Sequence, residues 1–243
     1  MLIIPLVAKE VSREMPMYHP RLTTIDPAET KRYAGLTSKS DFSAALLAEA
    51  CTQGQLLAMP KGVWQVYVYD QEEHTILSPE PLVLTADSVI KHLHGASQVA
   101  VMAVTIGLPL EQEVSNLFSQ NQYTLALLLD AAGTTAVETA CDAVCTIIGQ
   151  HAGRSGLTAG RRFSPGYGGW SVEVQPEILK LATGASIELS VTDTKMLVPR
   201  KSVTAIVGLY PYHQTVNLSH QQELACDKCG QAGCHARKET ISK

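Results

Sequence analysis

The sequence predicts an α+β protein with a twisted, largely antiparallel sheet flanked by helices. Segments with strand patterns and segments with helix patterns alternate irregularly, without the strand–helix–strand rhythm of parallel sheets. Of the 243 residues, 45% are hydrophobic and 17% are charged, which is enough apolar material for a sizeable core. No apolar run approaches the roughly 20 residues that a membrane-spanning helix needs.

The first third of the chain is expected to contain two helices and two strands. Asp26 is a suitable N-cap, because a proline follows at the first helical position and an acid two residues later. A second helix is expected from Ser40. Residues 63–69 are rich in β-branched and aromatic side chains, which predicts a strand, and residues 82–84 predict a short one.

The rest of the chain mixes both kinds of element. Residues 98–105 are nearly all apolar and indicate a buried strand. The longest helical pattern covers about residues 123–150, and a Gly-rich loop is expected at 153–169. The remaining expected elements are a helix capped by Asp87 that stops at Gly95, a helix from Pro109, a helix from Pro176 to Leu181, and strands at 187–192 and 203–209.

The chain is expected to form one domain, residues 1–218, followed by a polar, Cys-rich tail, residues 219–243. The net charge of −4 and the aromatic content of 5% argue against a nucleic-acid surface or attraction to an anionic membrane. The apolar start, residues 1–7, lacks a basic region and is expected to be a strand or a docked terminus rather than a signal peptide. We therefore expect a cytoplasmic protein.

Several common ligand-binding motifs are absent from the sequence. There is no P-loop, no Gly-x-Gly-x-x-Gly between a strand and a helix, and no Gly-x-Ser-x-Gly. The Asp-x-His-x-x-Gly pattern of base-off cobalamin-binding domains is also absent, because neither His92 nor His94 follows the required Asp. Both histidines fall near an expected helix C-terminus, so we expect them to be surface residues stabilised by the helix dipole.

One loop has the residue types of a small-molecule site. Residues 161–170 read Arg-Arg-Phe-Ser-Pro-Gly-Tyr-Gly-Gly-Trp. Pro165 fixes a turn, Gly166 lets a ligand approach the backbone, and Tyr167 offers an apolar face with a polar tip. Arg162 can bind a carboxylate through two parallel hydrogen bonds. On chemistry alone, a purely structural turn is the more common use of such a loop.

The long helix carries an acid inside an apolar run. Glu138 shares a helix face with Asp142, because residues four apart are neighbours on a helix. Its carboxylate could bind a ligand amino group or ribose, or it could pair with an arginine such as Arg161. Cys141 and Cys145 are also four apart, and their apolar neighbours predict that they are core residues.

Two motifs together resemble a known family. Arg162-x-x-Pro-Gly-Tyr and the stretch 189–196 match, in order and approximate spacing, the Arg-x-x-Pro-Gly-Tyr and Leu-Thr-Glu-Ser-x-x-Met motifs of the activation domain of cobalamin-dependent methionine synthase. Runs at 162–168, 175–177 and 196–209 are similar to those of small free-standing proteins that resemble this domain. The resemblance extends from about residue 26 to residue 237, and on it the chain is identified as a free-standing member of the methionine synthase activation-domain family.

The resemblance implies binding of S-adenosyl-L-methionine (AdoMet) for the reductive remethylation of cob(II)alamin. The chain would be an accessory reactivation protein for a methionine synthase or a related corrinoid methyltransferase. That partner would hold the cobalamin, an electron donor protein would supply the electron, and no residue of this chain need be catalytic. Arg162 would bind the methionine carboxylate. The cofactor-binding residues expected on this basis are Arg162, Pro165, Gly166, Tyr167, Glu138, Asp193 and Tyr210.

The tail contains a second signal, the cluster Cys226-x-x-Cys229 with Cys234. Thiolates at this spacing can chelate Zn²⁺, with a histidine or a distant cysteine as the fourth ligand, or hold an iron–sulfur cluster with an open iron. The alternative is a set of reduced, exposed thiols. In a cytoplasmic chain of this size, disulfides are the less common use of cysteine.

A second interpretation is a non-enzymatic metal-binding or redox adaptor that has the same fold and has lost AdoMet binding. In the synthase family an N-terminal Asp contacts the ligand amino group, and no matching motif occurs in this sequence. A Tyr-Tyr pair of that family is replaced by Tyr210-Pro-Tyr212. These differences favour the adaptor, whereas the intact Arg162 motif favours the reactivation protein.

Overall fold

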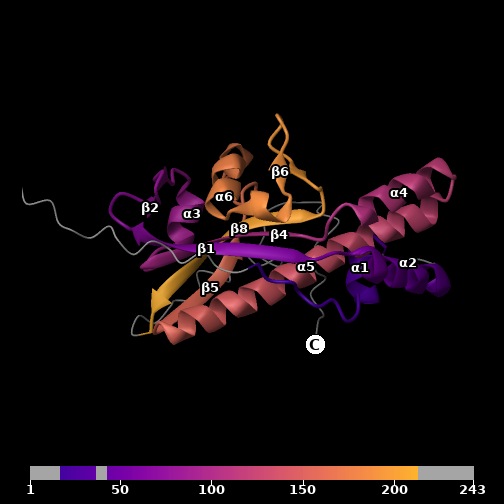
Figure 1. Ribbon diagram of the computed structural model, residues 1–243, viewed down its shortest axis with the longest axis horizontal. Coiled ribbons are helices and arrows are strands. Elements are labelled where there is room, and N and C mark those ends of the chain that lie inside the picture. Colours follow the sequence, from indigo (N-terminus) through magenta and orange to yellow (C-terminus); the bar gives the residue numbers. More distant parts are fainter. Residues whose placement is uncertain (1–16, 37–42, 213–243) are drawn as a thin grey trace, which may run out of the picture.

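The computed structural model describes residues 17–36 and 43–212 (Figure 1). The described helices are α1 (Pro27–Tyr33), α2 (Ala44–Leu57), α3 (Asp87–His92), α4 (Pro109–Ser119), α5 (Tyr123–Arg154) and α6 (Gln175–Leu181), with 3-10 turns η1 (Val172–Val174) and η2 (Gly184–Ile187). The described strands are β1 (Lys61–Asp70), β2 (Thr75–Leu77), β3 (Leu82–Val83), β4 (Gln98–Thr105), β5 (Leu157–Phe163), β6 (Ser190–Val191), β7 (Leu197–Val198) and β8 (Ser202–Pro211). The expectations for residues 1–7, for a helix start at Ser40 and for the tail 219–243 lie outside the described residues.

Six strands form one sheet in the order β3-β2-β1-β4-β8-β5, and every pairing in it is antiparallel. β4 lies in its centre, where β1 and β8 pair with it along its whole length. All of its residues from Val99 to Thr105 are buried, as its continuous apolar run predicts. β6 and β7 form a separate two-stranded hairpin. The expected α+β class with an antiparallel sheet is confirmed.

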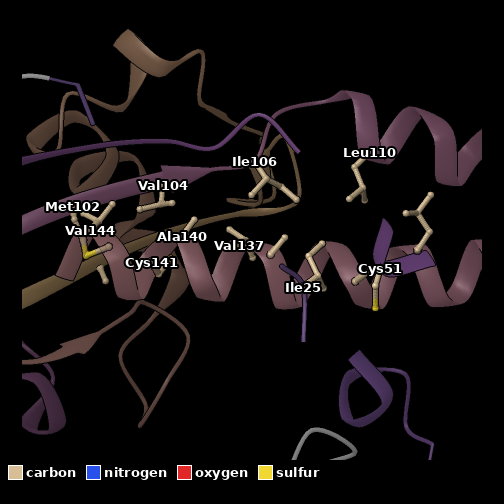
Figure 2. Packing of buried hydrophobic residues seen from close by; sticks show 14 of the residues in the cluster. Ile25, Cys51, Met102, Val104, Ile106, Leu110, Val137, Ala140, Cys141 and Val144 are labelled. Carbon is tan, nitrogen blue, oxygen red and sulfur yellow. The ribbon is translucent and has the colours of Figure 1, made fainter. Parts of the chain in front are cut away.

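Helices cover both faces of the sheet (Figure 1). The long helix α5 crosses one face, and α1, α2 and α4 gather around its first half. Alternate residues of β4 pack on this side, and Figure 2 shows Met102 and Val104 against Val144 and Cys141 of α5. The intervening residues of β4 face a second core beneath α3, α6 and the β6–β7 hairpin. We call the two sides the α5 face and the α3/α6 face.

Close contact between α5 and the sheet depends on a glycine. A Cβ built on Gly62 of β1 would lie 2.5 Å from Cγ2 of Val144, so a side chain at this position would push the helix off the sheet. The same glycine exchanges two backbone hydrogen bonds of 2.8 Å with Tyr18, which fixes the start of the described chain along β1.

Three expectations about local structure are wrong. The predicted Gly-rich loop at 153–169 contains the strand β5, since pairing with β8 overrides the weak strand propensity of its glycine and arginines. Of the predicted strand at 187–192, just Ser190–Val191 is a strand, because Glu188 adopts a left-handed backbone with φ of 64°. Asp87 is the first helical residue of α3 rather than its cap.

Candidate functional site

A β-bulge in β5 decides which face of the sheet Arg162 occupies. Ala159 pairs with Leu209 and Arg162 pairs with Val207, so β5 advances one residue more than β8 between these two pairs. The extra residue interrupts the alternation of side chains along the strand. Arg162 therefore shares the α5 face with Val207, while Phe163 enters the core of the α3/α6 face.

The guanidinium of Arg162 forms ion pairs with two carboxylates of α5. Its Nη2 donates to Oε2 of Glu138, and its Nη1 donates to Oδ1 of Asp142, one helical turn further along. The exposed fraction of the side chain is 24% for Arg162, 37% for Glu138 and 75% for Asp142. The arginine thus lies largely buried beneath a carboxylate that is open to solvent. We call these three residues the Arg162 cluster.

The charges of this cluster are stable at neutral pH. Burial opposes the charge of Arg162, but the negative charges around it, among them the carboxylates of Glu138 and Asp142, outweigh this effect and raise the pKa of the guanidinium above its ordinary value. Arginine therefore stays protonated here, as it does elsewhere in proteins. With two carboxylates around one guanidinium, the cluster carries one net negative charge.

Two thiols of α5 lie beside the ion pairs. Burial raises the pKa of Cys141, and it raises the pKa of Cys145 although the guanidinium of Arg162 acts in the opposite direction. Both groups are therefore thiols rather than reactive thiolates at neutral pH. Sγ of Cys145 lies 3.7 Å from Sδ of Met102, and Cys141 is fully buried, so the expected core role of both cysteines is confirmed.

Tyr33, at the end of α1, belongs to the same region of the α5 face. Burial and then the carboxylate of Glu138 raise the pKa of its phenol. The guanidinium carbon of Arg32 lies 4.0 Å from the centre of its ring. No local sequence signal indicates Tyr33, because it comes near Glu138 through the contact of α1 with α5, which are far apart in the sequence.

The loop after β5 forms a closed turn. The backbone N–H of Gly166 donates to the carbonyl of Trp170 at 2.7 Å, and the N–H of Trp170 donates to the carbonyl of Tyr167 at 2.9 Å. Gly166 has φ of 91°, a conformation that strongly favours glycine. Pro165 is half-buried, whereas the side chain of Tyr167 is 69% exposed. The turn therefore presents a tyrosine ring and open backbone next to the strand end that carries Arg162.

An aromatic stack on the α3/α6 face packs against this turn. The ring of Phe163 lies between Trp170, at a centroid distance of 5.9 Å, and His92, at 4.9 Å. Nε2 of His92 is 2.9 Å from the carbonyl oxygen of Arg161, and burial lowers the pKa of the imidazole. The expectation of a surface histidine is wrong for His92, which is 6% exposed, because the last turn of α3 packs against β5.

Two expected binding residues also lie on the α3/α6 face. Tyr210 is 2% exposed, and its hydroxyl donates to the carbonyl of His92 at 2.6 Å. Its ring lies over Gly208, where a Cβ would come within 2.6 Å of the hydroxyl oxygen. Asp193 is exposed in the turn of the β6–β7 hairpin. The structure thus joins Arg162 to Glu138 and Asp142 on the α5 face. The Pro-Gly-Tyr turn follows the same strand, and Tyr210 and Asp193 lie across the sheet from the ion pairs.

The other expected site falls outside the described residues. Cys226, Cys229 and Cys234 belong to the segment 213–243. Within residues 17–36 and 43–212, no group of three His, Cys, Asp or Glu side chains is placed to hold a metal ion. No helix in that part of the chain is long and apolar enough to cross a membrane.

Comparison with known proteins gives information on the fold. No protein-family profile and no curated protein matches the sequence. Among solved structures, the fold is similar to the crystal structure of the MetH reactivation domain bound to AdoHcy, with a TM-score of 0.56 and 13% sequence identity over 84% of this chain and 81% of that chain. The chain therefore has the fold of the MetH reactivation domain.

Proposed function

We propose that the chain binds AdoMet at the Arg162 cluster and is an accessory reactivation protein for a cobalamin-dependent methionine synthase or a related corrinoid methyltransferase. The observation that carries the proposal is the convergence of Arg162, Glu138 and Asp142 at the strand end that enters the Pro-Gly-Tyr turn. The shared fold supports it, because the similar domain was solved with AdoHcy bound.

The charges of the Arg162 cluster fit those of AdoMet. At neutral pH the ligand carries a carboxylate, an ammonium and a sulfonium, which leave one net positive charge against the one net negative charge of the cluster. Arg162 would bind the carboxylate, and the two acids would accept from the ammonium. Because the side chain of Asp142 is 75% exposed, its pairing with Arg162 is weak enough to be exchanged for a ligand.

The turn after β5 fits the uncharged part of such a ligand. The exposed ring of Tyr167 offers a surface for an aromatic base. Gly166 is exposed and adopts a φ of 91°, so a ligand would meet backbone rather than a side chain at this position. These residues would hold and orient the ligand, and catalysis would rest on positioning.

In this role the chain supplies a binding site rather than an acid or a base. AdoMet supplies the methyl group when it is bound. The cobalamin would be held by the partner methyltransferase, and a separate donor protein would provide the electron. This chain would contribute the charged Arg162 cluster and the exposed ring of Tyr167.

Isothermal calorimetry with AdoMet tests the binding site. Wild type should bind, and Arg162→Ala should weaken the affinity by about 100-fold or more, because a charge-assisted bidentate contact is lost. Arg161→Ala is the matched control, since it removes the same charge from the exposed neighbouring side chain. The absence of heat with wild type would rule out the proposal.

A reconstitution assay tests the function. A methionine synthase core in the cob(II)alamin state is incubated with reductant and AdoMet, with and without this protein. The protein should increase the recovered activity, and Arg162→Ala should not. Equal recovery in all three samples contradicts the reactivation role even if AdoMet binds.

The adaptor hypothesis has its own experiment, because it depends on the cysteines of the tail. Metal analysis and visible spectra of anaerobically purified protein should show zinc or an iron–sulfur chromophore that is lost on Cys226→Ser. Bound metal in a wild type that binds no AdoMet would favour the adaptor over the reactivation protein.

A further inference from the structure

The carbonyl of Arg161 belongs to the bulged part of β5, and a side chain from another element satisfies it. It lies 2.9 Å from Nε2 of His92, at the end of α3. A carbonyl oxygen can accept but not donate, so Nε2 of the imidazole carries the proton. The hydrogen bond therefore joins α3 to the strand segment whose register places Arg162.

The register of this segment determines the face on which each side chain lies. Without the bulge, the pairing of Ala159 with Leu209 would continue and would place Arg162 opposite Ile206, on the α3/α6 face. Phe163 would move to the α5 face at the same time, because a slip of one residue exchanges the faces of a strand. Arg162 would then lie across the sheet from Glu138.

We propose that His92 is the positioning residue that holds β5 in the bulged register and so presents Arg162 to the carboxylates of α5. This inference rests on the proposed function, because it gives the AdoMet site a support on the opposite face of the sheet. His92 does not touch the Arg162 cluster; it acts through the carbonyl of Arg161 and the ring of Phe163.

His92 is itself fixed from several directions. Its ring stacks on Phe163 at a centroid distance of 4.9 Å, with 26° between the ring planes. Its backbone carbonyl accepts from the hydroxyl of Tyr210 at 2.6 Å. Nδ1 is buried, and no partner among the described residues donates to it or accepts from it. A buried neutral ring with Nε2–H is thus the form that these surroundings support.

One turn before His92, Ser88 makes a related contact. A Cβ at Gly168 would lie 3.2 Å from Cβ of Ser88 and 3.1 Å from Cζ of Phe163. The face of α3 that carries His92 therefore also limits the position of the turn after β5.

Three variants distinguish the effect of the His92 hydrogen bond from the effect of its side-chain volume. His92→Leu removes the donor and keeps an apolar side chain, whereas His92→Gln can place its amide nitrogen near the position of Nε2. His94→Leu is the matched control, because His94 is exposed two residues further along. AdoMet affinity should fall by about tenfold or more in His92→Leu and should be largely restored in His92→Gln, because a charge-assisted contact depends on the register.

Amide hydrogen exchange gives a readout that needs no ligand. Exchange in residues 157–163 should accelerate in His92→Leu and remain near the wild-type rate in His92→Gln and His94→Leu. Equal exchange in all four proteins overturns the proposal, and so does a His92→Gln as impaired as His92→Leu. If wild type binds no AdoMet, the exchange data still decide the role of His92, so the two hypotheses fail separately.

Nitrogen-15 NMR of the wild type covers the case in which His92→Leu does not fold. If Nε2 of His92 donates to the carbonyl of Arg161, the ring should be the Nε2–H tautomer and its proton should exchange slowly with water. A rapidly exchanging ring proton or the Nδ1–H tautomer would show that no such hydrogen bond supports Arg161.

Discussion

Two basic side chains are anchored on α5, and they are held in different ways. Lys201, directly before β8, donates from Nζ to Asp130 and to Thr134, each at 2.9 Å, and its side chain is 13% exposed. Arg162 donates to Glu138 and Asp142, but the second carboxylate is 75% exposed. Asp130, the acid paired with Lys201, is 43% exposed. The Lys201 anchor is therefore closed around its cation, and the Arg162 anchor is open to solvent at one of its two acids.

The surroundings of the two anchors explain this difference. The backbone N–H of Lys201 donates to Glu111 at 2.7 Å, so this anchor ties together α4, α5 and the start of β8. Arg162 instead lies at the end of an edge strand, next to a turn with an exposed Tyr167. Removal of a cation enclosed between elements leaves its partners unpaired and destabilises the fold, whereas a cation beside an exposed turn can exchange its partners for a ligand.

The largest effect on stability is expected at the closed anchor. Lys201→Met keeps the apolar stem and removes the charge, which should lower the free energy of unfolding by about 2 kcal/mol, because the partners of the ammonium lose a largely buried hydrogen-bonding group. AdoMet affinity should not change. Urea denaturation and calorimetry give the two values.

Arg200→Met is the matched control for that substitution. Arg200 is 66% exposed and lies 3.5 Å from Glu111, so its loss should change stability by less than about 0.5 kcal/mol. If Lys201→Met weakened AdoMet binding as strongly as Arg162→Ala, the distinction between a structural and a ligand-binding anchor would be wrong.

Lowering the pH should reduce the stability that His92 contributes and should leave the contribution of the Lys201 ion pair unchanged. Burial lowers the pKa of His92 in the folded protein below its ordinary value of 6.5. The imidazole therefore binds a proton more tightly in the unfolded chain than in the folded protein. The stability contributed by neutral His92 is therefore complete above about pH 6.5 and is lost as the pH falls, by at most about 1.4 kcal/mol per pH unit.

Urea unfolding between pH 8 and pH 5 measures this loss. The stability of wild type should fall more steeply with acid than that of His92→Gln, because glutamine does not titrate. Parallel curves for the two proteins would mean that His92 does not couple to folding. Lys201→Met should show the wild-type slope, since its ion pair does not involve His92.

The sequence predicts more of the fold than of the site. The continuous apolar run of β4 and the length of α5 follow from patterns within one element, so both are predicted. β5 is missed because its pairing with β8, and not its own composition, makes it a strand. The buried state of His92 is missed for the same reason, since a helix C-terminus alone does not reveal what packs against it.

Which arginine pairs with Glu138 could not be predicted from the sequence either. The sequence suggests an arginine such as Arg161 as the partner of Glu138, and alternation alone would place Arg161 on the face of Leu157 and Ala159. The bulge reverses this assignment and selects Arg162. Gly160 is a weak local signal of a bulge, but the strand itself and its register depend on pairing with β8, which the local sequence does not reveal.

A smaller effect is expected at the open carboxylate. Asp142→Asn should weaken AdoMet binding about fivefold, because one acceptor for the ammonium loses its charge. The free energy of unfolding should change by less than about 0.5 kcal/mol, since the pair with Arg162 is largely exposed at this acid. Asp130→Asn should do the reverse and lower stability without changing affinity. The same response from both variants would remove the contrast between the anchors.

The smallest expected effect is a salt-dependent preference between two ligands. AdoHcy lacks the sulfonium charge, so the net negative charge of the Arg162 cluster should favour AdoMet by about threefold at low ionic strength. At 1 M salt the screening length is about 3 Å, and the preference should nearly vanish. Calorimetry of both ligands at 0.01 M and 1 M salt measures it, and Asp142→Asn should show a smaller preference than wild type. A ratio of affinities that is independent of salt would mean that contacts with the methyl group, and not the charge of the open carboxylates, distinguish the two ligands.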